Sequence, residues 1–223
     1  VGAAEVTVRH WRTEGSSEYS DFFLAPVDQD YVTSTTAAEV SLPVGETGEA
    51  RFAVNHLEDE IQQNQSPDFL ETDRDTFDAQ YDWKWSDVHG LGVGAMYTRE
   101  RADSESYGEG FKSDTDAVNV YVQDRITSGP HLALLVLGYT DHETAGSEFT
   151  FNAEYGYAFN EQRTRVYALA GSGFRAPDAT DRYGYGGNPD LKPESSRNYE
   201  IGVKHALTPQ QSLTLSAFHT DIE

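Results

Sequence analysis

The sequence predicts an all-β protein, an antiparallel up-and-down β-barrel that crosses a membrane. Apolar and polar residues alternate with a period of two in many segments, which is typical of strands with one apolar face. Short turns alternate with longer connections along the 223 residues, as in a meander whose hairpins turn at two opposite rims. A soluble β-sandwich would show the same alternation, so the lengths of the segments must separate the two classes.

The alternating segments define the strands in chain order. Ala4–Trp11 opens the series, and in Phe149–Phe159 the apolar side chains share one face while the polar ones share the other. A slip of one residue would move every apolar side chain to the wrong face, so each register is strongly specified. In the other strands the apolar faces are carried by Val40, Leu42, Val44; Phe77, Ala79, Tyr81, Trp83, Trp85; Leu91, Val93, Ala95, Tyr97; Val118, Val120, Val122; Tyr199, Ile201, Val203; and Leu213, Leu215, Ala217.

The connections fall into two classes by length. Short turns are predicted at Gly45–Gly48, Ser86–Gly90, Thr127–Pro130, Asn160–Arg163 and Thr208–Gln211. Longer loops are predicted at Thr13–Asp30, Gln62–Glu71, Ser106–Ser113, His142–Ser147 and Ala176–Arg197. This leaves about eleven strands of roughly 9 to 14 residues, whereas sandwich strands are typically about 5–6 residues long and a barrel strand needs about 9–11 to cross the hydrocarbon. Strand length therefore favours the transmembrane barrel.

Composition excludes several classes of function. The formal net charge of −22 argues against a nucleic-acid partner, because binding phosphates needs a basic face. The excess of acid suggests divalent cations or loops that face water. The chain has no cysteine, so disulfides and thiolate chemistry are excluded. Val1–Trp11 lacks the pattern of a signal peptide, and the longest apolar run, Leu132–Leu137, is far shorter than the roughly 20 residues of a spanning helix.

Catalytic patterns are also missing from the sequence. No G-x-S-x-G elbow occurs, and Gly171–Gly173 reads as a strand end. Asp141–His142 and Asp87–His89 could serve in a barrel enzyme, but no pattern pairs them with a nucleophile or a second acid. The seven histidines lack the spacing of a zinc site. The chain is therefore predicted not to be an enzyme.

The most informative stretch is FRAPDATDRYGYGGNPDLKPE, residues 174–194, with the strand that follows it. Its prolines fix extended or turn conformations and its glycines permit otherwise strained angles. The pattern resembles the C-terminal barrel signature of TonB-dependent outer-membrane receptors. The residues that carry this resemblance are Phe174, Arg175, Ala176, Pro177, Asn188, Pro189, Leu191, Pro193, Glu194, Tyr199, Glu200 and Gly202.

Within that family, GSSEYSDFFLAPVDQDY, NQSPDF and DRYGYGGNPDLKPESSRNYEIG are most similar to cobalamin receptors. The resemblance implies a barrel of 22 strands with an N-terminal plug in the Gram-negative outer membrane. It also implies capture of cobalamin or another metal-chelate nutrient, uptake powered by the TonB complex acting on the plug and its TonB box, and contact with outer-membrane lipid. Alternatives are a siderophore or haem receptor, a passive porin or outer-membrane enzyme barrel, and a soluble sandwich binder.

The strand count bears on how much of such a barrel is present. Bacterial single-chain barrels have an even number of strands, and the sequence begins and stops inside or next to predicted strands. Residues 1–223 are therefore expected to form one partial barrel domain, a fragment of about eleven strands, with the plug outside this chain. Such a half-barrel would expose two edges and an apolar band, and is not expected to fold stably as a soluble monomer.

Carboxylates in Thr13–Asp30 form the candidate metal site, composed of Glu18, Asp21, Asp28 and Asp30. Calcium takes six to eight oxygen ligands, which such a loop could supply, and some receptors of the resembled type use calcium to order their loops. No cofactor is required by any motif, and solvated acidic loops without an ion are common. Two further acidic groups are expected to line a polar lumen or solvated strand ends: Asp73, Asp75 and Asp78, and Asp114 and Asp116.

Aromatic residues supply the candidate ligand-binding surface, which comprises Tyr19, Phe22, Phe23, Tyr31, Tyr183 and Tyr185. They could cover the apolar face of a corrin-like ligand or belong to an interfacial belt. The loop that carries Tyr183 and Tyr185 could equally fold back onto the rim. In that case Glu194, Arg197 and Glu200 are expected to form a local charge network.

Overall fold

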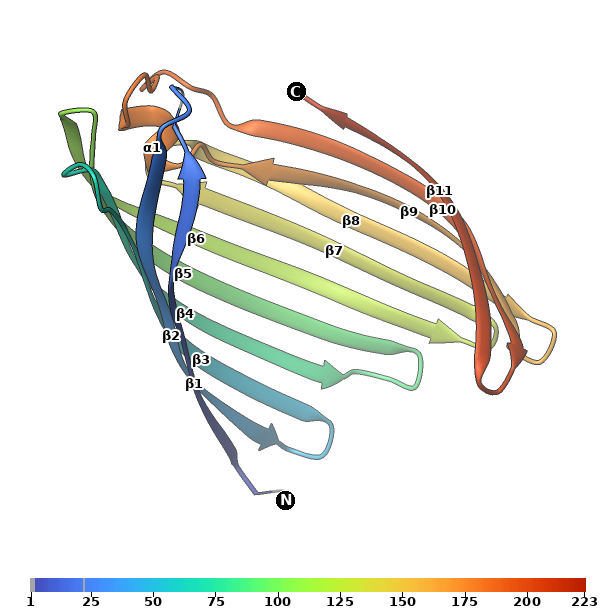
Figure 1. The fold of residues 1–223 in the computed structure, drawn as a ribbon. Helices are drawn as coiled ribbons and strands as arrows, with labels where there is room; N and C mark the ends of the chain where they lie inside the picture. Colours follow the sequence, from blue (N-terminus) through green and yellow to red (C-terminus); the bar gives the residue numbers. More distant parts are fainter. Residues whose placement is uncertain (1–2, 22) are drawn as a thin grey trace.

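The computed structural model describes residues 3–21 and 23–223, and most of them lie in β-strands (Figure 1). The strands are β1 (Glu5–Ser20), β2 (Pro26–Val44), β3 (Gly48–Gln63), β4 (Phe69–Lys84), β5 (His89–Ser106), β6 (Glu109–Ser128), β7 (His131–His142), β8 (Gly146–Phe159), β9 (Thr164–Arg175), β10 (Glu194–Thr208) and β11 (Gln211–Ile222). In the described chain, the short helix α1 (Ala179–Tyr183) is the sole α-helix, and it lies between β9 and β10. The all-β prediction is confirmed.

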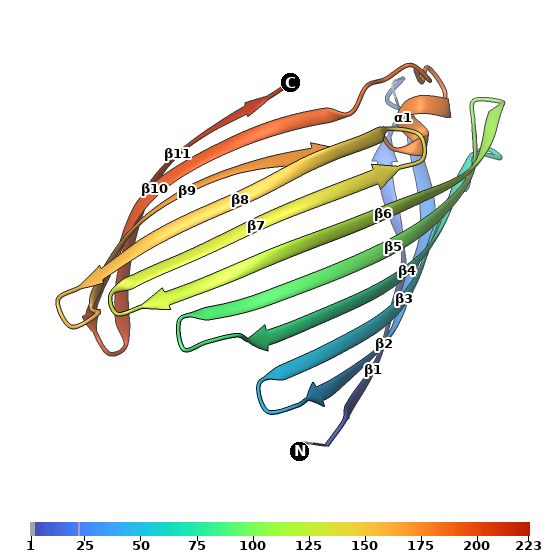
Figure 2. The same cartoon turned by 180° about the vertical axis from the view of Figure 1, so that it is seen from behind.

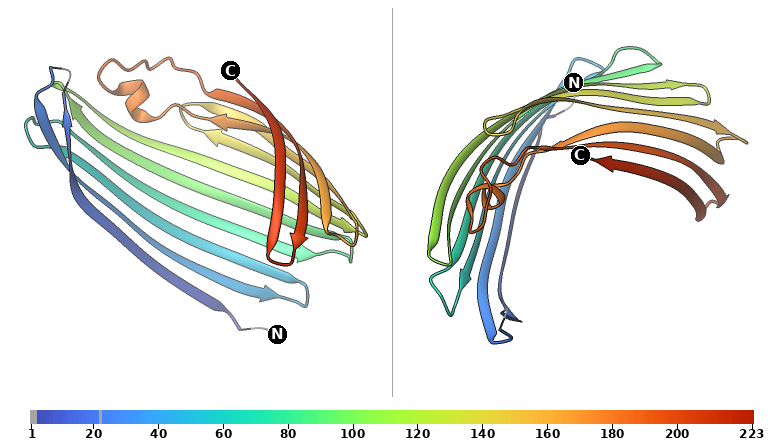
Figure 3. Two further views of the ribbon diagram at one scale, coloured as in Figure 1. Left: turned by 45° about the vertical axis from the view of Figure 1, so that its right-hand side comes forward. Right: turned by 90° about the horizontal axis from the view of Figure 1, so that it is seen from above.

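The strands form one antiparallel sheet in the order of the sequence, from β1 to β11. Every strand pairs with its neighbours along the chain, as the up-and-down prediction requires. The sheet curves into an open arc (Figures 2 and 3). Its two edges are β1 and β11, and no ladder joins them within the described residues. None of the helices within the described residues has the length and hydropathy of a membrane span.

Most strands are longer than predicted: β1 to β6 and β10 have 15 to 20 residues, whereas β7, β8, β9 and β11 have 12 to 14. The prediction that Thr13–Asp30 is a long loop is wrong, because β1 and β2 stay paired from Gly15↔Tyr31 to Ser20↔Pro26. The polar composition had suggested a loop, but a strand that is solvated on both faces can still form a ladder of backbone hydrogen bonds with its neighbour. The connections left at this rim are residues 21–25, 64–68, 107–108, 143–145 and 176–193, so the last one alone is long.

The convex face of the arc carries the apolar side chains. One continuous row of directly opposite residues crosses eight strands: Val6, Val40, Phe52, Ala79, Ala95, Val120, Tyr139 and Phe149. These side chains are not covered by other described parts of the chain, and Ala102 is the sole apolar residue that is buried within it. The molecule therefore has an apolar outer band in place of an internal core.

Aromatic residues border this band at both ends. At the rim with the short turns, the rings of Tyr81 and Trp83 stack with centroids 5.1 Å apart. Toward the other rim, Phe77 and Tyr97 lie 6.2 Å apart, and the Tyr97 hydroxyl donates to Asp116 at 2.7 Å. Phe77 to Trp83 spans six residues, roughly 20 Å along the strand. A band of this height between aromatic girdles is typical of the membrane face of a barrel.

The concave face is polar and its side chains pair with one another. Arg51 and Asp82 lie 3.0 Å apart, and the Tyr167 hydroxyl donates to Glu200 at 2.6 Å. The ring of Tyr167 lies directly over Gly202, where a Cβ atom would come within 2.5 Å of the ring. Gly202 is therefore required by a close approach of its neighbour rather than by an unusual backbone angle.

Candidate functional site

The signature loop, residues 176–193, lies inside the arc of the sheet at the rim opposite the short turns (Figure 3). Asp178 caps α1 at its start, because its carboxylate accepts the backbone N–H of Asp181 at 2.7 Å. Asn188 closes the following turn by accepting the N–H of Asp190 at 3.0 Å. The loop is thus a folded unit that covers part of the concave face.

Arg182 connects the signature loop to the rest of the rim. Its guanidinium donates to the carbonyl of Thr144, in the β7–β8 connection, at 3.1 Å. It also donates to the carbonyl of Pro189, within the signature loop, at 2.9 Å, and it lies 5.2 Å from the centre of the Tyr183 ring. A single side chain therefore holds α1, the far end of its loop and a neighbouring hairpin together.

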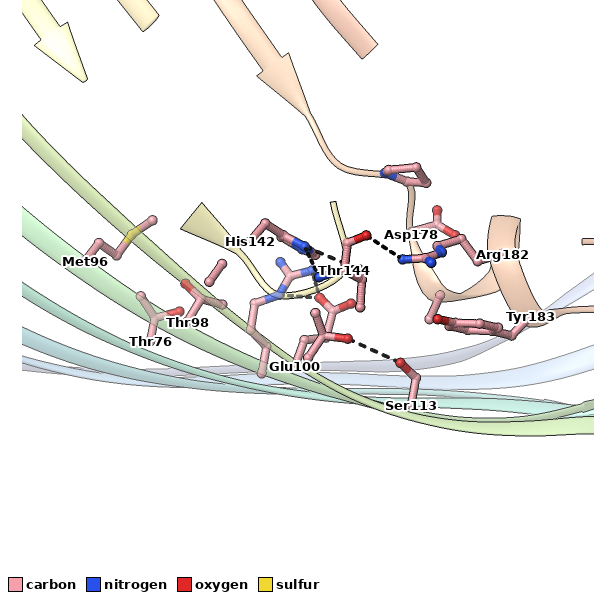
Figure 4. A pocket seen from close by; sticks show the side chains of 15 residues that line it. Thr76, Met96, Thr98, Glu100, Ser113, His142, Thr144, Asp178, Arg182 and Tyr183 are labelled. Carbon is pink, nitrogen blue, oxygen red and sulfur yellow. Dashed lines mark hydrogen bonds and ion pairs between the residues drawn. The ribbon is translucent and has the colours of Figure 1, made fainter. Parts of the chain in front are cut away.

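Beneath α1 lies a cavity of about 400 Å³ (Figure 4). Its floor consists of concave-face residues of β4, β5 and β6, among them Thr76, Thr98 and Thr115, and its roof includes Asp178 and Tyr183. The ion pair of Arg74 with Glu100 and the ring of His142 add charge and a titratable group to the wall. The cavity therefore offers hydrogen-bond donors and acceptors beside an aromatic ring.

The two tyrosines predicted as ligand contacts pack partly on the β5–β6 hairpin. The ring of Tyr185 lies 5.0 Å from that of Tyr107, and the ring of Tyr183 lies 6.1 Å from that of Phe111. Both tyrosines stay exposed on their other sides, Tyr185 at 61%. The loop thus folds back onto the rim and still presents aromatic surface, so ligand contact by these residues stays a prediction.

The other signature residues lie at the foot of the loop and in the strand after it. Ala176, Pro177 and Leu191 line a small recess where the two ends of the loop meet, together with Arg175 and Glu194. Phe174 lies opposite Ser195 in the β9–β10 ladder, Pro193 directly precedes β10, and Tyr199 lies on the convex face.

The predicted charge network among Glu194, Arg197 and Glu200 is wrong. Glu194 instead lies 3.5 Å from Arg175, which is directly opposite it in the ladder. Glu200 accepts from Tyr167. The period of the strand explains the error, because Arg197 lies on the face opposite to that of Glu194 and Glu200.

In the β1–β2 hairpin, the structure separates the predicted aromatics from the predicted carboxylates. Tyr19 and Tyr31 lie on the concave face, whereas Glu18, Asp28 and Asp30 lie on the convex face. The two groups alternate along the same strands, so they cannot line one site together. Asp21 lies in the turn, where its carboxylate accepts the N–H groups of Phe23 at 2.9 Å and Ala25 at 2.8 Å. Phe22 lies outside the described residues.

Asp28 is held by amides of the β3–β4 connection. Its carboxylate accepts hydrogen bonds from the side-chain amides of Asn64, at 2.5 Å, and of Gln65. Asp28 lies at the end of β2 that is far beyond the apolar band. The two hydrogen bonds lower the pKa of the Asp28 carboxyl. Within the described chain, no three of the four predicted carboxylates bring ligand atoms within 4.8 Å of one another. Calcium binding at this hairpin stays a prediction.

The chain belongs to the TonB dependent receptor-like, beta-barrel family, whose model matches residues 10–223. It is 26% identical over 207 residues to the vitamin B12 transporter BtuB of Photobacterium profundum, covering 87% of this chain and 34% of that protein. It is 30% identical over 139 residues to the vitamin B12 transporter BtuB of Vibrio vulnificus, which covers 60% of this chain and 22% of that protein. The chain thus spans at most about a third of the length of these relatives.

Solved structures show the same fold. The siderophore receptor PirA of Pseudomonas aeruginosa superposes with a TM-score of 0.78 at 16% identity, over 96% of this chain and 46% of that one. The ferric enterobactin receptor PfeA of the same organism, in complex with enterobactin, gives a TM-score of 0.74 at 13% identity, over 100% of this chain and 44% of that one. The alcaligin receptor FauA of Bordetella pertussis gives a TM-score of 0.72 at 16% identity, over 98% of this chain and 41% of that one.

Family membership confirms the resemblance seen in the signature and the expectation of a receptor rather than an enzyme. The family is one of outer-membrane barrels. Several site residues were not found from the sequence: Arg74, Glu100, Tyr107, Phe111 and Thr144. They come from hairpins far from the signature in sequence, so no local pattern indicated them. Arg182 lies inside the signature, but its role depends on carbonyls that only the fold brings near.

Proposed function

We propose that this chain forms the barrel wall of an outer-membrane receptor of Gram-negative bacteria that captures cobalamin at its concave, loop-bearing rim for TonB-energised uptake. The supporting observation is the 26% identity to a protein named as a vitamin B12 transporter, extending over 87% of the chain. The likeness to siderophore receptors lies between 12% and 16% identity, which supports the fold and not the ligand. A ferric siderophore is therefore the second candidate.

The concave face at the signature-loop rim suits a bulky, partly polar ligand. Tyr183 and Tyr185 offer exposed aromatic surface, and the cavity beside them contains Arg74, Glu100 and His142. Large ligands with an apolar ring and polar substituents need both kinds of contact. A cavity of about 400 Å³ accommodates part of such a ligand, so further contacts must come from elements that close the arc.

Closing the arc requires more strands, because β1 and β11 are both edges with one unpaired side among the described residues. Unpaired backbone groups are costly in a membrane, where only closed barrels and helices satisfy every N–H and C=O. The proposal therefore includes a complete barrel of 22 strands in which residues 1–223 supply half of the wall. A plug domain inside that barrel, with its TonB box, would receive the action of TonB.

Calcium is proposed as a structural ion of the β1–β2 hairpin. Glu18 lies directly opposite Asp28 on the convex face, and like charges in such positions destabilise a ladder unless a cation lies between them. Carboxylate oxygens are the ligands that calcium prefers. Binding of calcium would stiffen the hairpin above the apolar band.

Binding of cyanocobalamin to the full-length receptor in detergent tests the ligand proposal, with a ferric catecholate siderophore as the second probe. We expect cyanocobalamin to bind and the iron chelate not to bind. A Tyr183→Ala, Tyr185→Ala double variant should bind at least tenfold more weakly, whereas Tyr199→Ala, on the convex face, should bind normally. Binding of the iron chelate alone would replace cobalamin with the second candidate.

The calcium proposal is tested in the same binding assay after treatment with EDTA. Removal of the ion should weaken ligand binding and raise hydrogen exchange in β1 and β2, and both changes should reverse with added calcium. Asp28→Asn with Glu18→Gln should abolish the response to EDTA. An unchanged exchange rate in the presence of EDTA would contradict a calcium site in this hairpin.

A further inference from the structure

A separate group of ionisable side chains lies on the convex face of β3 and β4. His56 lies directly opposite Asp75, and Glu58 lies directly opposite Asp73, so that these residues form a square on one face of the sheet. Val54 and Phe77 are the last apolar pair before this square, on the side of the signature-loop rim. The group therefore lies at the border between the apolar band and the polar ends of the strands.

The imidazole of His56 is oriented by a neighbouring carboxylate. Its Nδ1 lies 2.7 Å from Asp75 Oδ1, and Asp75 Oδ2 accepts from Arg101 at 3.2 Å. Both oxygens of Asp75 are thereby engaged, and a neutral imidazole that donates from Nδ1 to Asp75 has its lone pair on Nε2. A carboxylate behind the imidazole is the usual arrangement that orients a metal-binding histidine.

The other ring nitrogen of His56, Nε2, lies beside a second carboxylate, that of Glu58. Nε2 lies 3.3 Å from Glu58 Oε1, while Glu58 Oε2 accepts from Ser34 at 3.1 Å. Asp73 forms no hydrogen bond or ion pair with any residue in the described ranges. Two directly opposite carboxylates repel each other, and ligand atoms of His56, Glu58 and Asp73 all lie within 4.8 Å of one another.

We propose that His56, Glu58 and Asp73 bind one divalent transition-metal ion of the zinc type, with Asp75 as the residue that orients His56. One imidazole nitrogen and two carboxylate oxygens are ligands that zinc accepts, and the exposed face leaves a fourth position for water. A hard ion such as calcium has no need of the imidazole. The bound ion would join β3 to β4 at the border of the apolar band.

The spacing of histidines along the sequence predicted no zinc site, and the register explains why. Asp73 and His56 are 17 positions apart in the sequence, and the β3–β4 ladder brings them onto one face. Only one histidine takes part, so no histidine-to-histidine spacing can indicate the site. Asp73 and Asp75 were expected at the lumen or at solvated strand ends, and the register places both on the convex face near the start of β4, beyond the last apolar pair.

Calorimetric titration of the full-length protein in detergent with Zn²⁺ tests this proposal, after removal of any affinity tag and of bound metal. We expect one site per chain. His56→Gln and Asp73→Asn should each weaken Zn²⁺ binding at least tenfold, and Asp75→Asn should weaken it by about 10- to 100-fold through loss of orientation. His10→Gln is the matched control, because His10 also lies on the convex face, and its one hydrogen-bond partner among the described residues is the hydroxyl of Thr36 at 2.9 Å.

Co²⁺ provides a second measurement that does not depend on affinity alone, since the intensity of its visible absorption reports the coordination number of the ion. The spectrum should show the intense bands of a four-coordinate ion, which are lost in His56→Gln and retained in His10→Gln. Equal Zn²⁺ affinity in the parent protein, His56→Gln and Asp73→Asn would overturn the proposal and show adventitious binding only. Absence of Zn²⁺ binding in the folded protein would also overturn it, and His56 would then be an imidazolium between Asp75 and Glu58.

Discussion

The convex and concave faces of the sheet are made by alternate residues of the same eleven strands, yet different contacts specify them. On the convex face, Val120 lies between Ala95 and Tyr139, and many apolar side chains would serve equally, because fluid lipid adapts to their shape. On the concave face, Tyr167 needs both the hydroxyl partner Glu200 and the space above Gly202. The outer face therefore depends on residue class, whereas the inner face depends on particular partners.

The largest expected effect comes from a charge placed in the apolar band. Leu137 lies on the convex face between Val122 and Phe151 and is 63% exposed to its surroundings. Leu137→Arg should lower the free energy of unfolding by about 2–4 kcal/mol, because the guanidinium must leave water for hydrocarbon. Denaturant titration of the protein in lipid vesicles measures this change.

Val136→Arg is the matched control for that prediction. Val136 is the preceding residue, but it faces the concave side between Gln123 and Asn152. A solvated, polar surface should accept the charge at a cost of less than about 1 kcal/mol. Equal destabilisation by the two variants would mean that the two faces do not differ as the register indicates.

The next effect tests close packing on the concave face. In Gly202→Ala the new methyl group would lie 2.5 Å from the ring of Tyr167, so the ring must move and its bond to Glu200 is lost. We expect a loss of about 1–3 kcal/mol of stability, as is usual for overpacking. Gly90→Ala should be nearly neutral, since the nearest atom to its Cβ is the Arg125 carbonyl oxygen at 3.8 Å.

A double variant shows whether the ring of Tyr167 causes the loss of stability in Gly202→Ala. If the clash with Tyr167 explains the loss, Tyr167→Ala should make the further change Gly202→Ala nearly free of cost. Additive losses in the double variant would instead point to a backbone effect at Gly202. The same denaturant titration serves for both variants.

A smaller, local effect is expected at the signature loop. Removal of the guanidinium in Arg182→Ala breaks its bonds to the carbonyls of Thr144 and Pro189. The loop should then open about tenfold more often, which corresponds to about 1.4 kcal/mol. Hydrogen exchange of the Asn188 and Leu191 amides, which are bonded within the loop, measures the opening.

Arg163 provides the control for this experiment. Its guanidinium also donates to two carbonyls, those of Ala206 and Leu207, but at the rim with the short turns. Arg163→Ala should leave exchange in the signature loop unchanged. A loop that exchanges equally fast in the parent protein and in Arg182→Ala would show that Arg182 does not hold it.

The difference between the convex and the concave face also explains which features could be predicted from the sequence. The period of two gave the strands and their faces, because Val118, Val120 and Val122 had to point outward together. The long pairing of β1 with β2 was missed, since Glu18 and Asp28 are polar on a solvated ladder and polarity alone resembles a loop. The partners of Arg182 were missed as well, because Thr144 is 38 positions away in the sequence and only the register brings it near.

The smallest effect concerns ion pairs on the two faces. Arg99 and Asp114 form a pair on the convex face beyond the apolar band, and their side chains are 48% and 47% exposed. Arg99→Met should cost little stability, because water screens an exposed pair. At about 1 M salt, where the screening length falls to about 3 Å, this cost should vanish. Arg165, paired with Glu154 on the concave face, is 37% exposed with its partner at 29%, so the cost of Arg165→Met should persist in salt. A cost for Arg99→Met that persists in salt would mean that packing, and not charge, keeps this pair in place.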